Sequence, residues 1–271
     1  MIKINNIMEI IDYKDSGSFS NVYEINYIPL NKVCLMKIEE KDKDKLYYEM
    51  LIYKKLKGKD YNLYLPDIYD FIETDNYNCL IMENCGISLE NLINNSKLIN
   101  FVMINNTKYS FNILNKKLFN SIKNNMVKCL EYIHNYDIIH RDIKPANFIY
   151  NETTKSLKLV DFGLSYILNE KNIHKKTNKF IGTYRYCSKN ALKKYNLFYK
   201  DDCESLIYTM LFCYYGFLPW QNSLSYNKVN KLKYSIEQYK KDFNLDNYFF
   251  YSLKYLHCLD FNEKPNYNLL L

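Results

Sequence analysis

Two short motifs constrain the fold of this chain more than any other part of its sequence. The first is I-I-H-R-D-I-K-P-A-N-F at residues 138–148, and the second is L-V-D-F-G at residues 159–163. The segments 148–151 and 157–161 flank N-E-T-T-K and predict a short antiparallel hairpin. In such a hairpin the start of one strand lies beside the end of the other. Asn147 and Asp161 are therefore expected to meet at one end of it.

The residue types at this end of the hairpin suit phosphoryl transfer. Asn147 and Asp161 offer oxygen ligands for Mg²⁺, which takes few protein oxygens together with phosphates. Asp142 can accept a hydroxyl proton, and Lys144 can neutralise a transferring phosphoryl group. The alternative is that Asp161 and Asn147 cap a turn while Asp142 is solvated. That alternative requires several coincidences at once, so the catalytic interpretation is the stronger.

A second pair of charged residues is predicted from its apolar surroundings. Lys37 ends the apolar strand V-C-L-M-K. In the helix predicted at 45–56, Glu49 falls within the inward stripe formed by Leu46, Ile52, Tyr53 and Leu56. A carboxylate in an apolar stripe needs a partner, and Lys37 on the neighbouring strand is the candidate. The alternative is a surface pair at a strand–helix junction.

The order of the predicted elements indicates an α+β fold with two lobes. Strands are predicted at 7–11, 22–25, 33–38, 68–72 and 79–82, and the helix at 45–56 interrupts them. After Gly86 a helical spacing dominates, as in Leu118, Ile122 and Met126. We expect a single domain over 1–271. It has a small five-stranded lobe at about 1–83, a hinge at about 83–88 and a larger, mainly helical lobe at about 89–271.

Composition narrows the class of protein. The chain is 48% hydrophobic and 25% charged, which is ordinary for a soluble globular protein. Its most apolar stretch, 206–220, is shorter than the roughly 20 residues that a membrane span needs, so we expect no membrane partner. The net charge of +7 can attract acidic partners, but charge alone is weak support for nucleic-acid binding, and we expect none.

The eight cysteines predict a reduced, cytoplasmic protein. They show no C-x-x-C pair, and most lie in apolar runs, where a free cysteine packs as a small hydrophobe. Their even number would also allow disulfides. The N-terminus lacks a secretory-signal pattern, however, which favours the reduced state and leaves access to the nucleus open.

These motifs together resemble the signatures of eukaryotic protein kinases: a glycine-rich loop, a strand lysine, a helix glutamate, H-R-D-x-K-x-x-N and D-F-G. Further segments look like those of the casein kinase 1 superfamily, which also includes the vaccinia-related kinases. They are I-M-E-N-C-G-I-S-L-E-N-L at 81–92, G-T-Y-R-Y at 182–186, D-D-C-E-S-L at 201–206, L-P-W-Q at 218–221 and F-N-E-K-P-N-Y at 261–267. The resemblance covers essentially the whole chain and implies the two-lobed kinase fold.

The resemblance implies a nucleotide site. By this similarity Lys37 holds the α- and β-phosphates of ATP and pairs with Glu49. Met82 corresponds to the gatekeeper, and backbone groups of Glu83 and Cys85 meet the adenine. The loop over the nucleotide contributes Gly17, Ser18, Phe19 and Val22.

It also implies the catalytic roles. Asp142 matches the catalytic base, Lys144 contacts the γ-phosphate, and Asn147 and Asp161 bind Mg²⁺. Lys144 is also the serine/threonine-type signature. In casein kinase 1 a basic pocket near the activation segment favours acidic or phosphorylated substrates. Arg185 matches one of its members, and Lys233 in K-L-K-Y matches another by a looser alignment, the alternative being a solvated lysine.

Three positions depart from the family pattern. Asp15 and Ser20 replace the first and third glycines of the nucleotide loop, where the backbone approaches phosphate closely. Leu35 replaces a small alanine above the adenine and narrows the pocket. These changes predict weakened ATP affinity rather than none, because no catalytic group is lost.

The sequence therefore predicts a serine/threonine protein kinase that uses ATP and Mg²⁺ and acts on Ser or Thr of proteins, with acidic or pre-phosphorylated sites preferred. The alternative is a kinase-fold binding scaffold with weak or no phosphoryl transfer, which the altered nucleotide loop favours. A small-molecule phosphotransferase of related fold is disfavoured by G-T-Y-R-Y, which resembles a peptide-binding segment.

Overall fold

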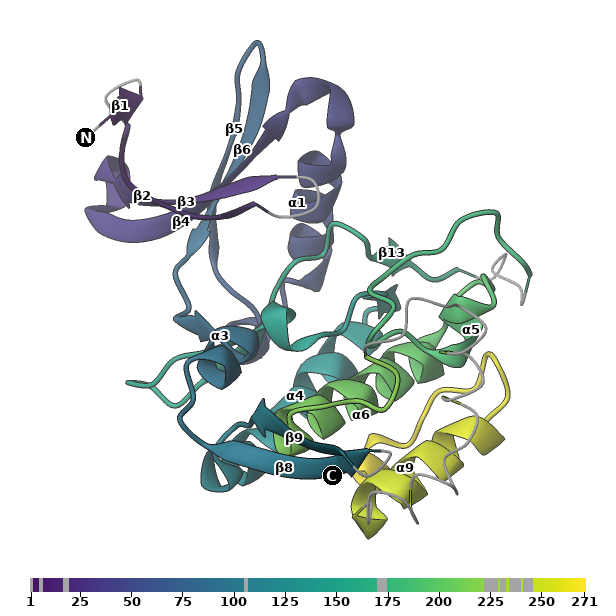
Figure 1. Cartoon of the computed structure of the whole chain (residues 1–271). Helices are drawn as coiled ribbons and strands as arrows, with labels where there is room; N and C mark the ends of the chain where they lie inside the picture. The colour runs from purple at the N-terminus through teal and green to yellow at the C-terminus, as the bar shows by residue number, and fades with distance from the viewer. Residues whose placement is uncertain are drawn as a thin grey trace. The chain divides into compact units, whose positions relative to one another are not determined.

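The structure is a computed structural model that describes residues 2–4, 7–16, 20–104, 107–169, 175–221, 229, 233, 240 and 246–271. The backbone divides into two compact units (Figure 1). The first comprises Met1–Gly86 and Val160–Gly163, and the second comprises Ile87–Leu159 and Leu164–Leu271. The D-F-G motif thus belongs with the first unit, although the second unit surrounds it in sequence.

An antiparallel sheet of order β1-β2-β3-β4-β6-β5 forms the first unit. The five predicted strands are present, and the short β1 adds a sixth at the edge. Short helical segments η1 (Ile28–Leu30), η2 (Lys41–Lys43) and α2 (Tyr61–Tyr64) connect the strands. The strands are β1 (Ile2–Ile4), β2 (Met8–Ser16), β3 (Asn21–Tyr27), β4 (Lys32–Glu40), β5 (Ile68–Glu73) and β6 (Tyr77–Glu83).

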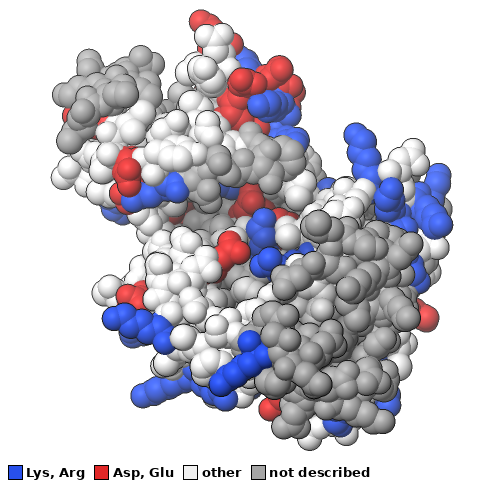
Figure 2. Space-filling model, in the orientation of Figure 1, with Lys and Arg blue, Asp and Glu red and all other residues white. Residues whose placement is uncertain are grey.

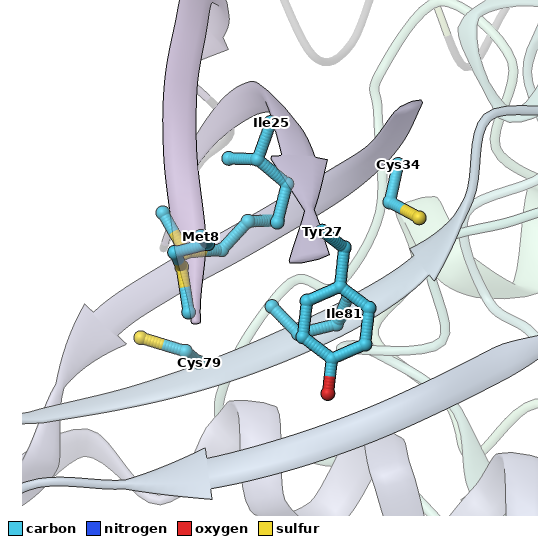
Figure 3. Close-up of a cluster of buried hydrophobic side chains, with 7 residues drawn as sticks. Met8, Ile25, Tyr27, Cys34, Cys79 and Ile81 are labelled. Atoms are coloured by element: carbon cyan, nitrogen blue, oxygen red, sulfur yellow. The ribbon is translucent and has the colours of Figure 1, made fainter. Parts of the chain in front are cut away.

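Alternation along the strands separates the two faces of this sheet. Figure 3 shows one buried cluster, which takes Ile25 and Tyr27 from β3 and Cys34 from β4. These positions are two residues apart within a strand or lie directly opposite in register, so they share one face. The hydroxyl of Tyr27 at the edge of this core donates to Asp70 at 2.7 Å, which satisfies its polar end.

The opposite face carries the predicted helix α1 (Lys45–Leu56), whose bounds match the expectation. This helix contacts β4, β5 and β6. Its buried residues include Leu46, Ile52 and Leu56, as the apolar stripe predicts. Glu49 is buried among them, which places a carboxylate on the inner side of the helix.

Three long helices dominate the described residues of the second unit. They are α4 (Lys116–His134), α6 (Tyr199–Tyr215) and α9 (Asn247–Cys258), and α6 packs against both of the others. Nearly all of α6 is buried. It ends at Gly216, where φ is +78° and an added Cβ would lie 2.5 Å from the carbonyl oxygen of Asn112, so only glycine fits.

Shorter elements make up the rest of the second unit as far as the structure describes it. The predicted hairpin is present as β11 (Phe148–Tyr150) and β12 (Leu157–Leu159), with β7 (Ile87–Ser88) on its other side. Phe148 pairs with Leu159, the antiparallel arrangement that the sequence predicts. The remaining elements are α3 (Leu89–Asn94), β10 (Ile138–Ile139), η3 (Pro145–Asn147), β13 (Tyr166–Ile167), α5 (Lys189–Leu192) and η4 (Tyr267–Leu270).

The longest strands of the second unit were not predicted. A two-stranded ribbon of β8 (Ile99–Ile104) and β9 (Thr107–Asn112) lies between α3 and α4, where the sequence predicts only helices. Its first strand, I-N-F-V-M-I, is rich in β-branched and aromatic residues that favour strands. No helix among the described residues is long and apolar enough to cross a membrane.

Candidate active site

In the first unit Lys37 and Glu49 form the predicted ion pair. Alternation along β4 turns Lys37 toward the face that α1 covers, and its Nζ donates to Glu49 Oε1 at 2.8 Å. Both side chains are buried. A buried pair of this kind is screened little by water or salt, so its geometry is held firmly.

Lys37 has a second acidic partner in Asp161. Its Nζ donates to Asp161 Oδ1 at 3.1 Å, and the Asp161 side chain is 46% exposed. Burial alone would lower the pKa of Lys37, but the charges of Asp161 and Glu49 outweigh it and raise that pKa. The ammonium group therefore stays charged at neutral pH, shared between one buried and one accessible carboxylate.

The D-F-G segment is tied to α1 by two further contacts. The backbone N–H of Phe162 donates to Glu49 Oε1 at 3.2 Å. The Phe162 ring packs edge-on against Tyr53 with centroids 5.0 Å apart. Asp161 itself has a φ of 71°, a left-handed conformation that non-glycine residues seldom adopt. Such strain is typical of functional sites, where the surrounding contacts hold it in place.

In the second unit Asp142 lies at the centre of a hydrogen-bonded loop and is buried. Its Oδ1 accepts from the hydroxyl of Thr183 at 2.7 Å, and Lys144 Nζ lies 2.8 Å from its Oδ2. Asn147 Nδ2 donates to the Asp142 carbonyl oxygen at 2.8 Å. Each carboxylate oxygen can accept two hydrogen bonds, so an oriented Asp142 retains the capacity to take a proton from a hydroxyl group.

The backbone directly before Asp142 is fixed by Asp202 in α6. The Asp202 carboxylate accepts from the N–H groups of His140 at 2.6 Å and Arg141 at 2.9 Å. His134 Nε2 lies 3.1 Å from the same carboxylate. Gly182 approaches from the other side with a φ of +100°, and a Cβ there would lie 2.5 Å from the Arg141 carbonyl oxygen. The G-T-Y-R-Y segment therefore needs its glycine to come this close to the loop.

Thr183 is the residue that sequence reasoning missed. The motif G-T-Y-R-Y was recognised, but only as a family signature. The hydrogen bond to Asp142 spans 41 positions in the sequence, and local pattern carries no signal for such a contact.

The two residues expected at the anion site differ in their surroundings. Arg185 is half-buried, and its guanidinium lies over the rings of Tyr186 and Phe212. Lys233 is 1% exposed, and its Nζ donates to the carbonyl oxygens of Tyr184 at 3.1 Å and Cys187 at 2.6 Å. Burial lowers the pKa of Lys233. The tentative place of Lys233 in an anion site, and the alternative of a solvated lysine, both disagree with this burial.

The residues assigned to the nucleotide lie on β3, β4 and β6. Val22 pairs across the strands with Lys37, and Leu35 pairs directly with Met82. Leu35 is half-buried and Met82 is buried, and the narrowing of the nucleotide pocket by Leu35 stays a prediction.

Two hydrogen bonds to Asp67 hold the chain directly after Met82. The N–H of Glu83 donates to the Asp67 carbonyl oxygen at 2.8 Å, and Glu83 Oε2 accepts from the Asp67 N–H at 3.0 Å. Cys85 is buried. The loop residues Gly17, Ser18 and Phe19 lie outside the described part of the chain.

The donor set fits magnesium and a nucleotide. Asp161 presents an accessible carboxylate next to the Lys37 ammonium. Asn147 uses its Nδ2 within the catalytic loop, which leaves its Oδ1, a ligand type that Mg²⁺ accepts. Asn147 and Asp161 belong to different units, so their joint metal site stays a prediction.

Comparison with known families adds independent evidence. The family described as protein kinase domain matches residues 15–263. This chain belongs to the protein kinase domain family. Among solved structures, this kinase domain is similar to that of vaccinia related kinase 3, with a TM-score of 0.77 and 19% identity over 97% of this chain and 84% of the other. At that identity the likeness shows the kinase fold, and it confirms the α+β architecture expected from the sequence.

Proposed function

We propose that this kinase domain is an active serine/threonine protein kinase that transfers the γ-phosphate of Mg-ATP to proteins. The observation that carries the proposal is the Lys37 ammonium, held between buried Glu49 and accessible Asp161. A buried ion pair adds little stability compared with apolar residues of the same size, so folding alone does not account for it. The position of the Lys37 ammonium suits a cation that contacts the phosphates of a bound nucleotide.

The proposed division of labour follows the positions of the side chains. Lys37 holds the α- and β-phosphates, and Asn147 and Asp161 hold Mg²⁺. The bound metal ion supplies charge neutralisation on the phosphate oxygens. Asp142, oriented by Thr183 and Lys144, accepts the proton of the substrate hydroxyl. Lys144, which already contacts Asp142, neutralises charge that develops on the transferring group.

The proposed substrates are proteins with Ser or Thr acceptors. We include a preference for acidic or phosphorylated sites on the support of half-buried Arg185, whose guanidinium lies over the Tyr186 ring. Buried Lys233 has no part in this proposal. The two units are proposed to work as one kinase domain. A cytoplasmic location is proposed because all eight cysteines are free thiols, seven of them buried.

A scaffold without phosphoryl transfer is the second candidate. It is favoured by Leu35, which pairs with Met82 in the register and replaces a smaller residue expected above the adenine. It is also favoured by Asp15 and Ser20, which replace loop glycines. This candidate predicts weak or absent ATP binding, whereas the kinase proposal predicts reduced but measurable affinity.

The deciding experiment measures phosphate transfer from labelled Mg-ATP to casein and to the protein itself, with Asp161→Asn in parallel. We expect transfer that is lost in the variant, because the amide cannot supply the charge that Mg²⁺ needs. Thermal unfolding of both proteins controls for folding. Absence of transfer by the folded wild-type protein at millimolar ATP would contradict the kinase proposal, and nucleotide titration would then test the scaffold.

A further inference from the structure

The β8–β9 ribbon has one face fixed to the body of the second unit. Asn100 and Phe111 lie opposite each other in its register and so share a face. Asn100 Nδ2 donates to the carbonyl oxygen of Tyr215 at 2.9 Å. Phe111 stacks on Phe217 with ring centroids 5.3 Å apart. This face is thus anchored at the C-terminal end of α6.

On the other face of the ribbon, β8 presents two large apolar side chains to solvent opposite Asn112 and Ser110 of β9. Ile99 and Phe101 alternate with Asn100 and are 51% and 59% exposed. Leu98, immediately before the strand, is 44% exposed. A ribbon packed on one side normally places polar residues on the outside. Ser110 of β9 follows this rule, but Ile99 and Phe101 of β8 do not. Adjacent exposed apolar residues of this kind mark a contact surface.

The charged residues within the ribbon and directly before it in sequence are lysines. Lys108 Nζ lies 4.2 Å from the centroid of the Phe101 ring, and Lys97 is exposed next to Leu98. Figure 2 shows basic side chains crossing the surface over β8 and β9. No acidic residue occurs between Glu90 and Glu131, whereas the lysines there are Lys97, Lys108, Lys116, Lys117, Lys123 and Lys128.

We propose that the exposed face of the β8–β9 ribbon binds an anionic lipid surface. Ile99 and Phe101 enter the interfacial layer of the bilayer, and Lys97 and Lys108 pair with the headgroups. Apolar side chains ringed by lysines are the combination that such a surface binds. This is a surface contact and not a span. It goes beyond the proposed kinase activity and departs from the expectation that the chain has no membrane partner.

The charge pattern favours a lipid surface over other occupants. A second copy of this chain would bring lysine against lysine, which is repulsive. An acidic protein would need lysines only where its own carboxylates meet this surface. A uniformly anionic plane repels every acidic residue near it, which matches their complete absence from 91–130.

The test is sedimentation of the purified protein with vesicles. One set contains phosphatidylcholine with phosphatidylserine, and the other contains phosphatidylcholine alone. We expect binding to the anionic set only, with a loss at high salt because exposed charges are screened. Lys108→Gln should weaken binding about fivefold, the effect of roughly one lysine near a charged bilayer. The double variant Ile99→Ser/Phe101→Ser should weaken it by more.

Matched controls come from the first unit. Leu63 is 60% exposed and Lys55 is exposed, so Leu63→Ser and Lys55→Gln change the same residue types away from the ribbon. Both should bind like the wild type, and thermal unfolding should show all variants folded. Failure of the wild type to sediment with anionic vesicles overturns the proposal. Equal binding to neutral vesicles, or unchanged binding of the double variant, overturns it as well.

Two other occupants would be recognised in the same experiment. If the protein sediments without vesicles and the double variant does not, a second copy covers the ribbon. If polyglutamate binds in place of vesicles and Lys108→Gln removes that binding, the partner is an acidic protein. Either result rejects the lipid proposal.

Discussion

Thr183 Oγ1 donates a 2.7 Å hydrogen bond to Oδ1 of Asp142, so the G-T-Y-R-Y segment holds the proposed catalytic carboxylate directly. We predict that Thr183→Ala lowers kcat by about 10- to 100-fold, since a hydrogen bond to a charged group contributes roughly 1.5–3 kcal/mol. The KM for ATP should stay unchanged. Thr183→Ser keeps the hydroxyl and should recover most of the rate. A serine variant as slow as the alanine variant would show that the hydroxyl is not the cause.

The effects of substituting Lys37 and Glu49 on the free energy of unfolding should be strongly coupled. Lys37→Met leaves the buried Glu49 carboxylate without its cation and should lower the free energy of unfolding by about 3–5 kcal/mol. Adding Glu49→Leu removes the orphaned charge, so the double variant should be more stable than Lys37→Met alone. Denaturant unfolding of the wild type, both single variants and the double variant completes the cycle. Additive effects would argue against the pair.

Leu35 should control nucleotide affinity. Shortening it to alanine opens space beside Met82, and we predict that Leu35→Ala lowers the KM for ATP by about tenfold, equivalent to roughly 1.4 kcal/mol of binding. Val33→Ala on the same strand is the matched control, because Val33 is exposed and should leave the KM unchanged. The same KM in Leu35→Ala and wild type would remove Leu35 as an explanation of weak binding.

Lys233 should act on stability and not on substrate choice. Its ammonium satisfies two carbonyl oxygens, and each group left unpaired after Lys233→Met costs about 1–3 kcal/mol. We predict a lower free energy of unfolding and an unchanged ratio of kcat/KM between acidic and neutral peptides. Arg185→Ala, in contrast, should reduce that ratio. A shifted ratio in Lys233→Met would restore Lys233 to the substrate site.

Glu204 should make the fold sensitive to acid. It accepts from the hydroxyl of Tyr208 at 2.7 Å and lies 3.5 Å from His257 Nε2. Burial would raise the pKa of Glu204. The hydrogen bonds and charge of His257, helped by Lys189 and Tyr208, outweigh burial and lower that pKa from 4.5 to about 2.

The direction in which Glu204 changes stability with pH follows from proton binding. Below pH 4.5 the unfolded chain takes up a proton at Glu204 that the folded protein refuses until about pH 2. The stabilisation, about 3 kcal/mol by this shift, is complete above pH 4.5 and is lost as the pH falls toward 2. The difference in unfolding free energy between wild type and Glu204→Gln should therefore shrink from pH 7 to pH 3. A constant difference would contradict this account.

The sequence pattern was sufficient to predict elements and contacts that depend on residues close together in the sequence. The apolar spacing of 45–56 predicted α1 with its observed bounds, and the position of Glu49 in that stripe predicted its contact with Lys37. The strand alternation around N-E-T-T-K predicted the pairing of β11 with β12. In each case the period, 3.6 residues for a helix or 2 for a strand, can be recognised within about a dozen positions.

Contacts between distant segments were decided by the tertiary structure alone. The segment 99–104 is a short apolar run, which periodicity assigns to a strand or a buried helix equally well. Its partner β9 and its anchor on Tyr215 decide in favour of a ribbon with an exposed apolar face. The burial of Lys233 depends on the carbonyl oxygens of 184 and 187, which are 49 and 46 positions away.

The sequence alone thus determined the kinase motifs and the local helices and strands that contain them, because both follow from residue type and spacing. The bond between Thr183 and Asp142, and the placement of D-F-G with the first unit, arose only on folding. Hydrogen bonds and burial depend on which segments meet in space, and sequence periodicity holds no information about segments so far apart.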